Sequence, residues 1–143
     1  MKRRTTELML ERDSAIEHLV GALENARMGA GRAVLVAGEA GIGKTALVER
    51  FVCDYARAER VLRGGGDTLS TPRPLGPLFD MASQLGTAVN DASRDHSQPF
   101  RIFSALLAEL TAQRTSSLIV IEDAHWADHA TLDLIRYLGR RIA

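Results

Sequence analysis

The sequence has a single cysteine, few prolines and no long hydrophobic run. Cys53 cannot form an internal disulfide, and its position in a predicted helix favours a small hydrophobic role over catalysis. No apolar run approaches the roughly 20 residues needed to cross a bilayer. The basic start at residues 1–4 precedes polar and acidic residues instead of the apolar core of a signal peptide. These absences predict a cytoplasmic chain with no membrane partner.

An excess of charge of one sign is also missing. Lysine plus arginine and aspartate plus glutamate each number 18, so the formal net charge is zero. This balance removes any general electrostatic argument for binding nucleic acid or anionic membranes, although a local basic patch stays open. A net charge near zero also permits self-association. The composition, 45% hydrophobic and 25% charged, is that of an ordinary globular domain.

A complete phosphate-loop motif is present at residues 38–45, which read GEAGIGKT. Glycines let backbone N–H groups turn inward around a polyphosphate, and the start of the following helix adds its positive dipole end. Lys44 is predicted to reach the β- and γ-phosphates, and the Thr45 hydroxyl to bind Mg²⁺. The predicted nucleotide-binding residues in this loop are Gly38, Glu39, Ala40, Gly41, Ile42, Gly43, Lys44 and Thr45.

The flanks of the motif supply the context that it requires. Residues 33–37 (AVLVA) form a continuous apolar run typical of a strand covered on both faces. Apolar residues at helical spacing follow the loop to about residue 57. Strand, loop and helix in this order favour nucleotide binding over the alternative, a glycine-rich turn that contains Lys-Thr by chance.

The remaining elements follow from spacing and from Gly and Pro. Asp13 or Ser14 is predicted to cap a helix over about 14–28. Three of the four prolines fall within residues 67–77, which predicts an extended surface loop. Further along, we predict a strand at 60–63, a short helix over 78–85, a mobile polar stretch at 90–98 and a helix over 100–110.

A second motif begins at residues 118–121, where four apolar residues precede Glu122 and Asp123. Mg²⁺ prefers hard carboxylate oxygens, and the carboxyl end of a buried strand can present them beside a phosphate loop. A second acid there could orient or deprotonate the attacking water. By itself, an apolar strand that ends in acids indicates only solvation or capping; the phosphate loop upstream favours the catalytic interpretation.

The segment at 120–128 (VIEDAHWAD) resembles the extended second motif of the signal-transduction ATPases with numerous domains (STAND). This group includes LuxR-type and MalT-like transcriptional regulators, whose ATPase module is similar to Orc-like AAA+ domains. Residues 10–13 (LERD) and 73–78 (RPLGPL) fit the family's order. The resemblance implies that Arg12 lies by the adenine, that Glu122 serves Mg²⁺ and that Asp123 serves the attacking water, with Lys44, Glu122 and Asp123 as the catalytic set.

The resemblance also implies a fold class: an α/β P-loop NTPase of the ASCE/AAA+ type, with a parallel sheet flanked by helices. Its five strands are expected in the order 5-1-4-3-2, and this sequence supplies the first three. We therefore expect one partial ATPase domain over 1–143, with a helical lead-in at 1–31 and an incomplete core at 32–143. An N-terminal fragment of this kind is expected to hydrolyse ATP poorly, and to meet DNA only through domains beyond residue 143.

Several neighbouring residues have simpler interpretations. Asp128 is explained by capping a final amphipathic helix, and His125 and Trp126 by packing and a local hydrogen bond. Arg73 lies among prolines and stays outside the predicted site. Two other functions remain open: a non-catalytic interaction or oligomerisation piece, and a small-molecule kinase, which the 120–128 segment disfavours.

Overall fold

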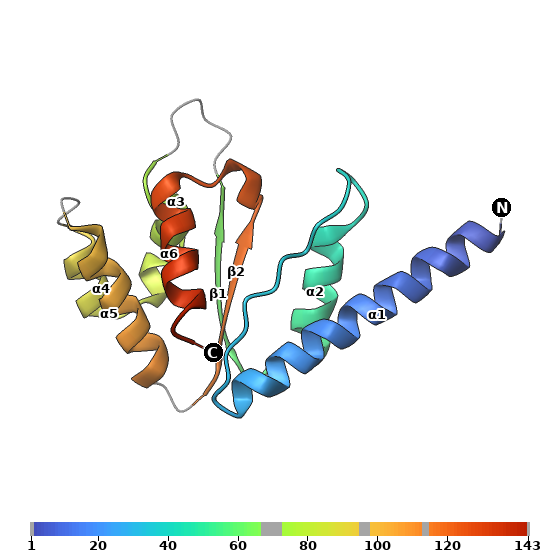
Figure 1. Ribbon diagram of the computed structural model, residues 1–143, viewed down its shortest axis with the longest axis horizontal. Helices are drawn as coiled ribbons and strands as arrows, with labels where there is room; N and C mark the ends of the chain where they lie inside the picture. The colour runs from blue at the N-terminus through green and yellow to red at the C-terminus, as the bar shows by residue number, and fades with distance from the viewer. Residues whose placement is uncertain (1, 67–72, 95–97, 113–114, 143) are drawn as a thin grey trace. The chain divides into compact units, whose positions relative to one another are not determined.

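The computed structural model describes residues 2–66, 73–94, 98–112 and 115–142, with side chains described from residue 12 onward (Figure 1). The chain divides into two compact units, residues 1–58 with 142–143, and residues 59–141. Among the described residues, no helix has both the length and the apolar character that crossing a membrane requires.

Two helices build the first unit. Helix α1 spans Lys2–Arg27 and helix α2 spans Lys44–Tyr55. Ile16 of α1 and Phe51 of α2 are buried, and the two helices contact each other. Nη2 of Arg27 donates a hydrogen bond of 3.0 Å to the backbone oxygen of Tyr55, which joins the carboxyl ends of the two helices.

The predicted start of the first helix is wrong. Helix α1 begins at Lys2, so Asp13 and Ser14 lie inside it and do not cap it. Residues 2–12 contain good helix formers and neither glycine nor proline, so no helix-stopping residue precedes position 13. The carboxyl end agrees with the prediction: Gly29 adopts a left-handed conformation with φ 89°, and the N–H of Ala30 donates to Asn25 O at 2.9 Å.

The strand predicted at 33–37 is also absent from the described structure, where these residues have no regular secondary structure. Val34 is 49% exposed and Leu35 is 82% exposed. A strand persists only when its N–H and C=O groups pair with a neighbouring strand. Within the described ranges, no strand pairs with this segment, so apolar composition alone does not make it a strand.

The second unit contains a two-stranded parallel sheet. Strand β1 spans Arg60–Gly65 and strand β2 spans Ser117–Glu122, and the register runs from Arg60 opposite Ser117 to Gly65 opposite Glu122. The strands predicted at 60–63 and 118–121 are confirmed. Their pairing also agrees with the neighbouring positions of strands two and three in the expected order. Glu122 therefore ends a strand at the carboxyl edge of a parallel sheet.

Helices lie beside this sheet (Figure 1). Their bounds are α3 Gly76–Asp80, the 3-10 turn η1 Ala82–Gln84, α4 Thr87–Ala92, α5 Pro99–Ala112, the 3-10 turn η2 Ala124–Trp126 and α6 His129–Gly139. Helix α5 confirms the prediction over 100–110, and the predicted helix over 78–85 occurs as α3 and η1. Of the stretch predicted to be mobile, residues 90–92 are helical and 95–97 lie outside the described residues. The predicted loop at 67–77 is described only from residue 73, and its last two residues begin α3.

The core of the second unit gathers around β1. Leu62 has no exposed surface, and its buried neighbours in the core include Val89, Ile102, Leu106 and Leu134. At the edge of this core, Arg60 Nη2 lies 2.7 Å from Glu109 Oε1, and the other carboxylate oxygen accepts the Gly86 N–H at 2.8 Å. This ion pair joins the start of β1 to α5 and to the turn before α4.

Candidate nucleotide-binding site

The phosphate loop enters helix α2 through two glycines in left-handed conformations. Gly41 has φ 78° and Gly43 has φ 96°, and Gly43 is the residue that precedes the first turn of α2. A side chain at these dihedrals is strained, so glycine is required there. The loop appears in Figure 1 as the bend that leads into α2. The local sequence thus places a tight backbone turn directly at a helix amino terminus.

Lys44 folds back over this loop. Its Nζ donates to Gly38 O and to Glu39 O, each at 2.9 Å, and the residue is half-buried. An ammonium group has three donors. Two of them hold the loop, and the third remains for an oxygen of a bound anion. The positive charge is therefore positioned over the loop by the loop's own carbonyl oxygens.

The first N–H groups of α2 are open. The helix has no side-chain cap, and its first bond to the backbone runs from Leu47 N to Gly43 O at 3.0 Å. Among the described residues, no acceptor takes the N–H groups of Lys44, Thr45 or Ala46. Such unpaired donors at a helix amino terminus, beside a fixed ammonium group, form an anion-binding arrangement. The residues present fit a polyphosphate, and Thr45 is exposed in the first turn, where its hydroxyl fits a metal on that phosphate.

Arg12 of α1 lies against the same loop. Its Nη2 donates to Ile42 O at 2.9 Å and lies 2.7 Å from the position that a Cβ atom on Gly43 would occupy. The resemblance implied a place by the adenine; the structure places the guanidinium at the loop backbone. Glu39, Ala40 and Ile42 are exposed on the loop. The structure thus brings together the predicted loop residues and Arg12.

The two predicted acids lie at the end of β2 in the second unit. Glu122 is half-buried, and its Oε1 lies 3.6 Å from Nη1 of Arg63 on β1. Asp123 is exposed and has φ 50°, a left-handed conformation that aspartate tolerates better than most residues. The strained backbone turns the chain from β2 into η2, and Asp123 O accepts the Trp126 N–H at 2.8 Å. Glu122 and Asp123 therefore stand side by side at a sheet edge.

Arg63 was not predicted as part of the site. In the parallel register Gly65 lies opposite Glu122, and Arg63 lies two residues before Gly65 on the same face of β1. The ion pair would compete with a metal for the Glu122 carboxylate. Side chains alternate between the two faces of β1, which could have placed Arg63 on the same face as Gly65. This points to Glu122 only once the register with β2 is known.

Asp128 is confirmed as the cap of α6. Its Oδ1 accepts the N–H groups of Thr131 at 3.0 Å and Leu75 at 3.2 Å, and its Oδ2 accepts the Thr131 hydroxyl. Burial raises the pKa of Asp128, but these hydrogen bonds from Thr131 and Leu75 outweigh it, so the pKa is lowered from its ordinary value. Leu75 is buried with φ 57°, so the cap also holds a strained residue that sequence reasoning missed.

The other residues considered from the sequence have local contacts. The guanidinium of Arg73 lies 4.4 Å from the centre of the Phe79 ring, and the rings of His125 and Trp126 are 5.2 Å apart. In the parts of the chain that the structure describes, no group of three or more His, Cys, Asp or Glu side chains could hold a metal.

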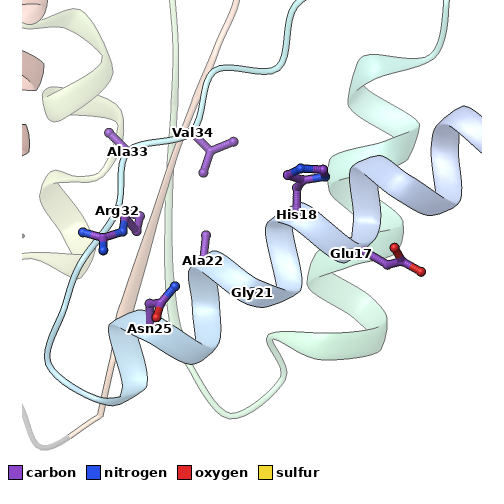
Figure 2. Close-up of a pocket in the computed structure, with 8 residues that line it drawn as sticks. All are labelled: Glu17, His18, Gly21, Ala22, Asn25, Arg32, Ala33 and Val34. Atoms are coloured by element: carbon purple, nitrogen blue, oxygen red, sulfur yellow. The ribbon is translucent and has the colours of Figure 1, made fainter.

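An open groove of about 510 Å³ lies within the first unit, between α1 and residues 32–34. Figure 2 shows Ala22 and Val34 facing each other across it, with His18 on the same side of α1. The His18 Nδ1 atom lies 2.8 Å from Ser14 O, which the preceding turn of α1 supplies. The residues that line the groove do not form a cluster of metal-ligating side chains. One wall of the groove is the start of the exposed apolar segment 33–37.

The comparisons with known proteins agree with the motifs. A family model described as AAA ATPase domain matches residues 9–143, whereas no curated protein and no solved structure matches. Domains of this kind bind and hydrolyse nucleotides, typically ATP with Mg²⁺. The match covers nearly the whole of this chain. The chain therefore belongs to the AAA ATPase domain family.

Proposed function

We propose that this chain is the ATP–Mg²⁺-binding module of a cytoplasmic regulatory ATPase of the STAND type, similar to LuxR-type and MalT-like transcriptional regulators. One observation carries the nucleotide part: the open N–H groups of Lys44, Thr45 and Ala46 meet a fixed lysine ammonium at one helix end. The regulator part is supported by the segments 10–13, 73–78 and 120–128.

The residues divide the work as follows. The loop amides and Lys44 bind the phosphates, and the Thr45 hydroxyl and the Glu122 carboxylate serve the metal. Asp123 holds and orients the attacking water. Bound Mg²⁺ neutralises charge that develops on the phosphates. Arg12 supports the loop through its hydrogen bond to Ile42 O, next to the left-handed Gly43. In a regulator, the occupancy of this loop biases a two-state switch.

Isothermal titration with ATP–Mg²⁺ tests the binding part. The wild-type chain is expected to bind, and Lys44→Ala to weaken binding by about tenfold or more, because a charge-assisted contact to phosphate is lost. Lys2 is the other lysine in the sequence, so Lys2→Ala removes the same charge as a matched control. Equal affinity of Lys44→Ala and Lys2→Ala would remove the central role of Lys44.

One observation favours a second function, self-association. The apolar segment 33–37 exposes Leu35 at 82% and has no strand partner among the described residues. An exposed segment with strand composition can pair with an edge of another chain. Light scattering after size exclusion gives the oligomeric state, and thermal unfolding gives the stability. Both measurements, with and without ATP–Mg²⁺, separate the two functions. A monomer in which ATP raises the unfolding temperature supports the binding module and argues against the interaction piece.

A further inference from the structure

A second groove lies within the unit of residues 59–141, between helices α5 and α6. It has a volume of about 440 Å³ and combines aromatic rings with arginines. We name it the arginine–aromatic groove and define it by Phe100, Asp133, Arg136, Tyr137, Arg140 and Arg141. Neither nucleotide motif contributes to it. Its composition differs from that of the first groove because three of its six defining residues are cationic.

The aromatic part of the groove is open to solvent. Phe100 lies in the first turn of α5 and is 61% exposed, and its ring meets the Tyr137 ring edge-on at 5.2 Å. Tyr137 also contacts the buried Phe103 ring at 5.6 Å. The rings are therefore anchored on their inner side, while Phe100 presents apolar surface outward. Large exposed aromatic surface beside a concavity is typical of interaction sites.

The arginines carry an unbalanced charge. Arg136 pairs with Asp133 at 3.2 Å, and the Arg141 guanidinium lies 3.9 Å from the centre of the Tyr137 ring. The Arg140 side chain has no partner among the described residues and is exposed. Three arginines against one aspartate leave two positive charges in a chain whose net charge is zero. Stacked and unpaired guanidinium groups are well suited to carboxylates, which they can bind through two parallel hydrogen bonds.

We propose that the arginine–aromatic groove binds an acidic peptide segment of a partner protein. An apolar side chain of the segment lies on Phe100, and its carboxylates meet Arg140 and Arg141. The observations favour a peptide over nucleic acid, because Arg136 is already paired and a nucleic acid strand needs several phosphate contacts along its length. A balanced chain also lacks the general attraction that draws proteins to nucleic acid.

A purely local role for these arginines makes a different prediction. Arg141 Nη1 donates to Tyr137 O at 3.3 Å, so it also supports the last turn of α6. If support of the helix were its whole role, substitution would lower the unfolding temperature and leave any peptide affinity unchanged. Arg140 separates the two roles, because its side chain makes no such contact in the described structure.

Fluorescence anisotropy tests the proposal on the full chain. The probe is a fluorescein-labelled peptide of alternating glutamate and aspartate around a central Phe-Leu pair. The wild type is expected to bind it, and Arg140→Ala and Phe100→Ala to weaken binding about tenfold each. The matched control is Arg94→Ala, because Arg94 is also an exposed arginine of the same unit and pairs with Asp91. Circular dichroism checks that the variants stay folded.

Two further measurements make the test decisive. The same peptide with every glutamate and aspartate replaced by glutamine and asparagine should no longer bind the wild type. This comparison changes only the peptide, so it does not depend on the folding of a variant. An oligothymidine strand of equal charge should bind more weakly than the acidic peptide. No binding of the acidic peptide to the wild type, equal affinity of Arg140→Ala and Arg94→Ala, or tighter binding of the oligonucleotide would overturn the proposal.

Discussion

Asp128→Ala should destabilise the second unit strongly, because one carboxylate joins two elements. It caps α6 through Thr131 and also accepts the N–H of Leu75, a buried residue with φ 57°. Loss of an N-cap costs about 1 kcal/mol. A buried N–H left without an acceptor costs about 1–3 kcal/mol more. We therefore expect a loss of about 2–4 kcal/mol in the free energy of unfolding, which is large for a domain of this size.

Urea denaturation followed by circular dichroism measures this loss. Asp133→Ala is the matched control: Asp133 lies on the same helix, its side chain is 63% exposed and, among the residues that the structure describes, it pairs only with Arg136 at the surface. The control should change stability by less than about 0.5 kcal/mol. Asp128→Asn keeps an oxygen for the cap and should fall between the two. A loss for Asp128→Ala no larger than that for Asp133→Ala would refute the reasoning.

The same carboxylate predicts a pH dependence. Burial raises the pKa of Asp128, but the hydrogen bonds from Thr131 and Leu75 lower it by more, so its pKa in the folded protein is below the ordinary 3.8. A depressed pKa means that the stabilisation is complete above about 3.8 and is lost as the pH falls through the folded value. The difference in free energy of unfolding between wild type and Asp128→Asn should therefore be constant near neutral pH and shrink only at pH values below about 3.8. A difference that shrinks already at neutral pH would contradict the assigned hydrogen bonds.

Two other substitutions test the loop and the core. Gly43→Ala should weaken ATP–Mg²⁺ binding about tenfold or more, because Gly43 has φ 96° and a Cβ there would lie 2.7 Å from Arg12 Nη2. The control in the same titration is Gly21→Ala, whose Cβ would meet nothing within 4 Å. Equal ATP–Mg²⁺ affinities of the two variants would contradict the strained turn at Gly43. Glu109→Gln should cost about 2–3 kcal/mol in urea denaturation, because Arg60 and Glu109 side chains are only 24% and 13% exposed and the pair loses its charge attraction. Asp91→Asn, which breaks an exposed pair with Arg94, should cost almost nothing, and a similar small effect at Glu109 would show that the buried pair contributes little.

Elements defined by local pattern were predicted well. Residues 100–110 repeat apolar side chains at helical spacing, and α5 spans Pro99–Ala112. Asp128 stands before an amphipathic stretch, and its carboxylate accepts the Thr131 N–H as a cap should. The glycines of the phosphate loop likewise specify their own turn. These features depend on interactions between residues a few positions apart, which the sequence displays directly.

Features that depend on distant partners were not predictable in this way. The apolar run at 33–37 reads as a buried strand, yet it has no pairing partner in the described structure and is exposed there. The helix start predicted at Asp13 or Ser14 was wrong, because a good capping residue does not end a helix that continues from before it. The Arg63–Glu122 pair required knowledge of the strand register.

The sequence by itself determined the phosphate loop, the acids after β2 and the cap of α6. It also determined membership in the AAA ATPase domain family, which these motifs indicate. Each is a short-range arrangement, in which backbone dihedrals and nearby hydrogen bonds follow from the residues in order. Only the tertiary structure decided which strands pair, that Arg12 lies on the loop backbone and that Asp128 also holds Leu75. These contacts join residues far apart in the chain, and their partners are chosen by packing and by the pairing of backbone groups, which no local pattern records.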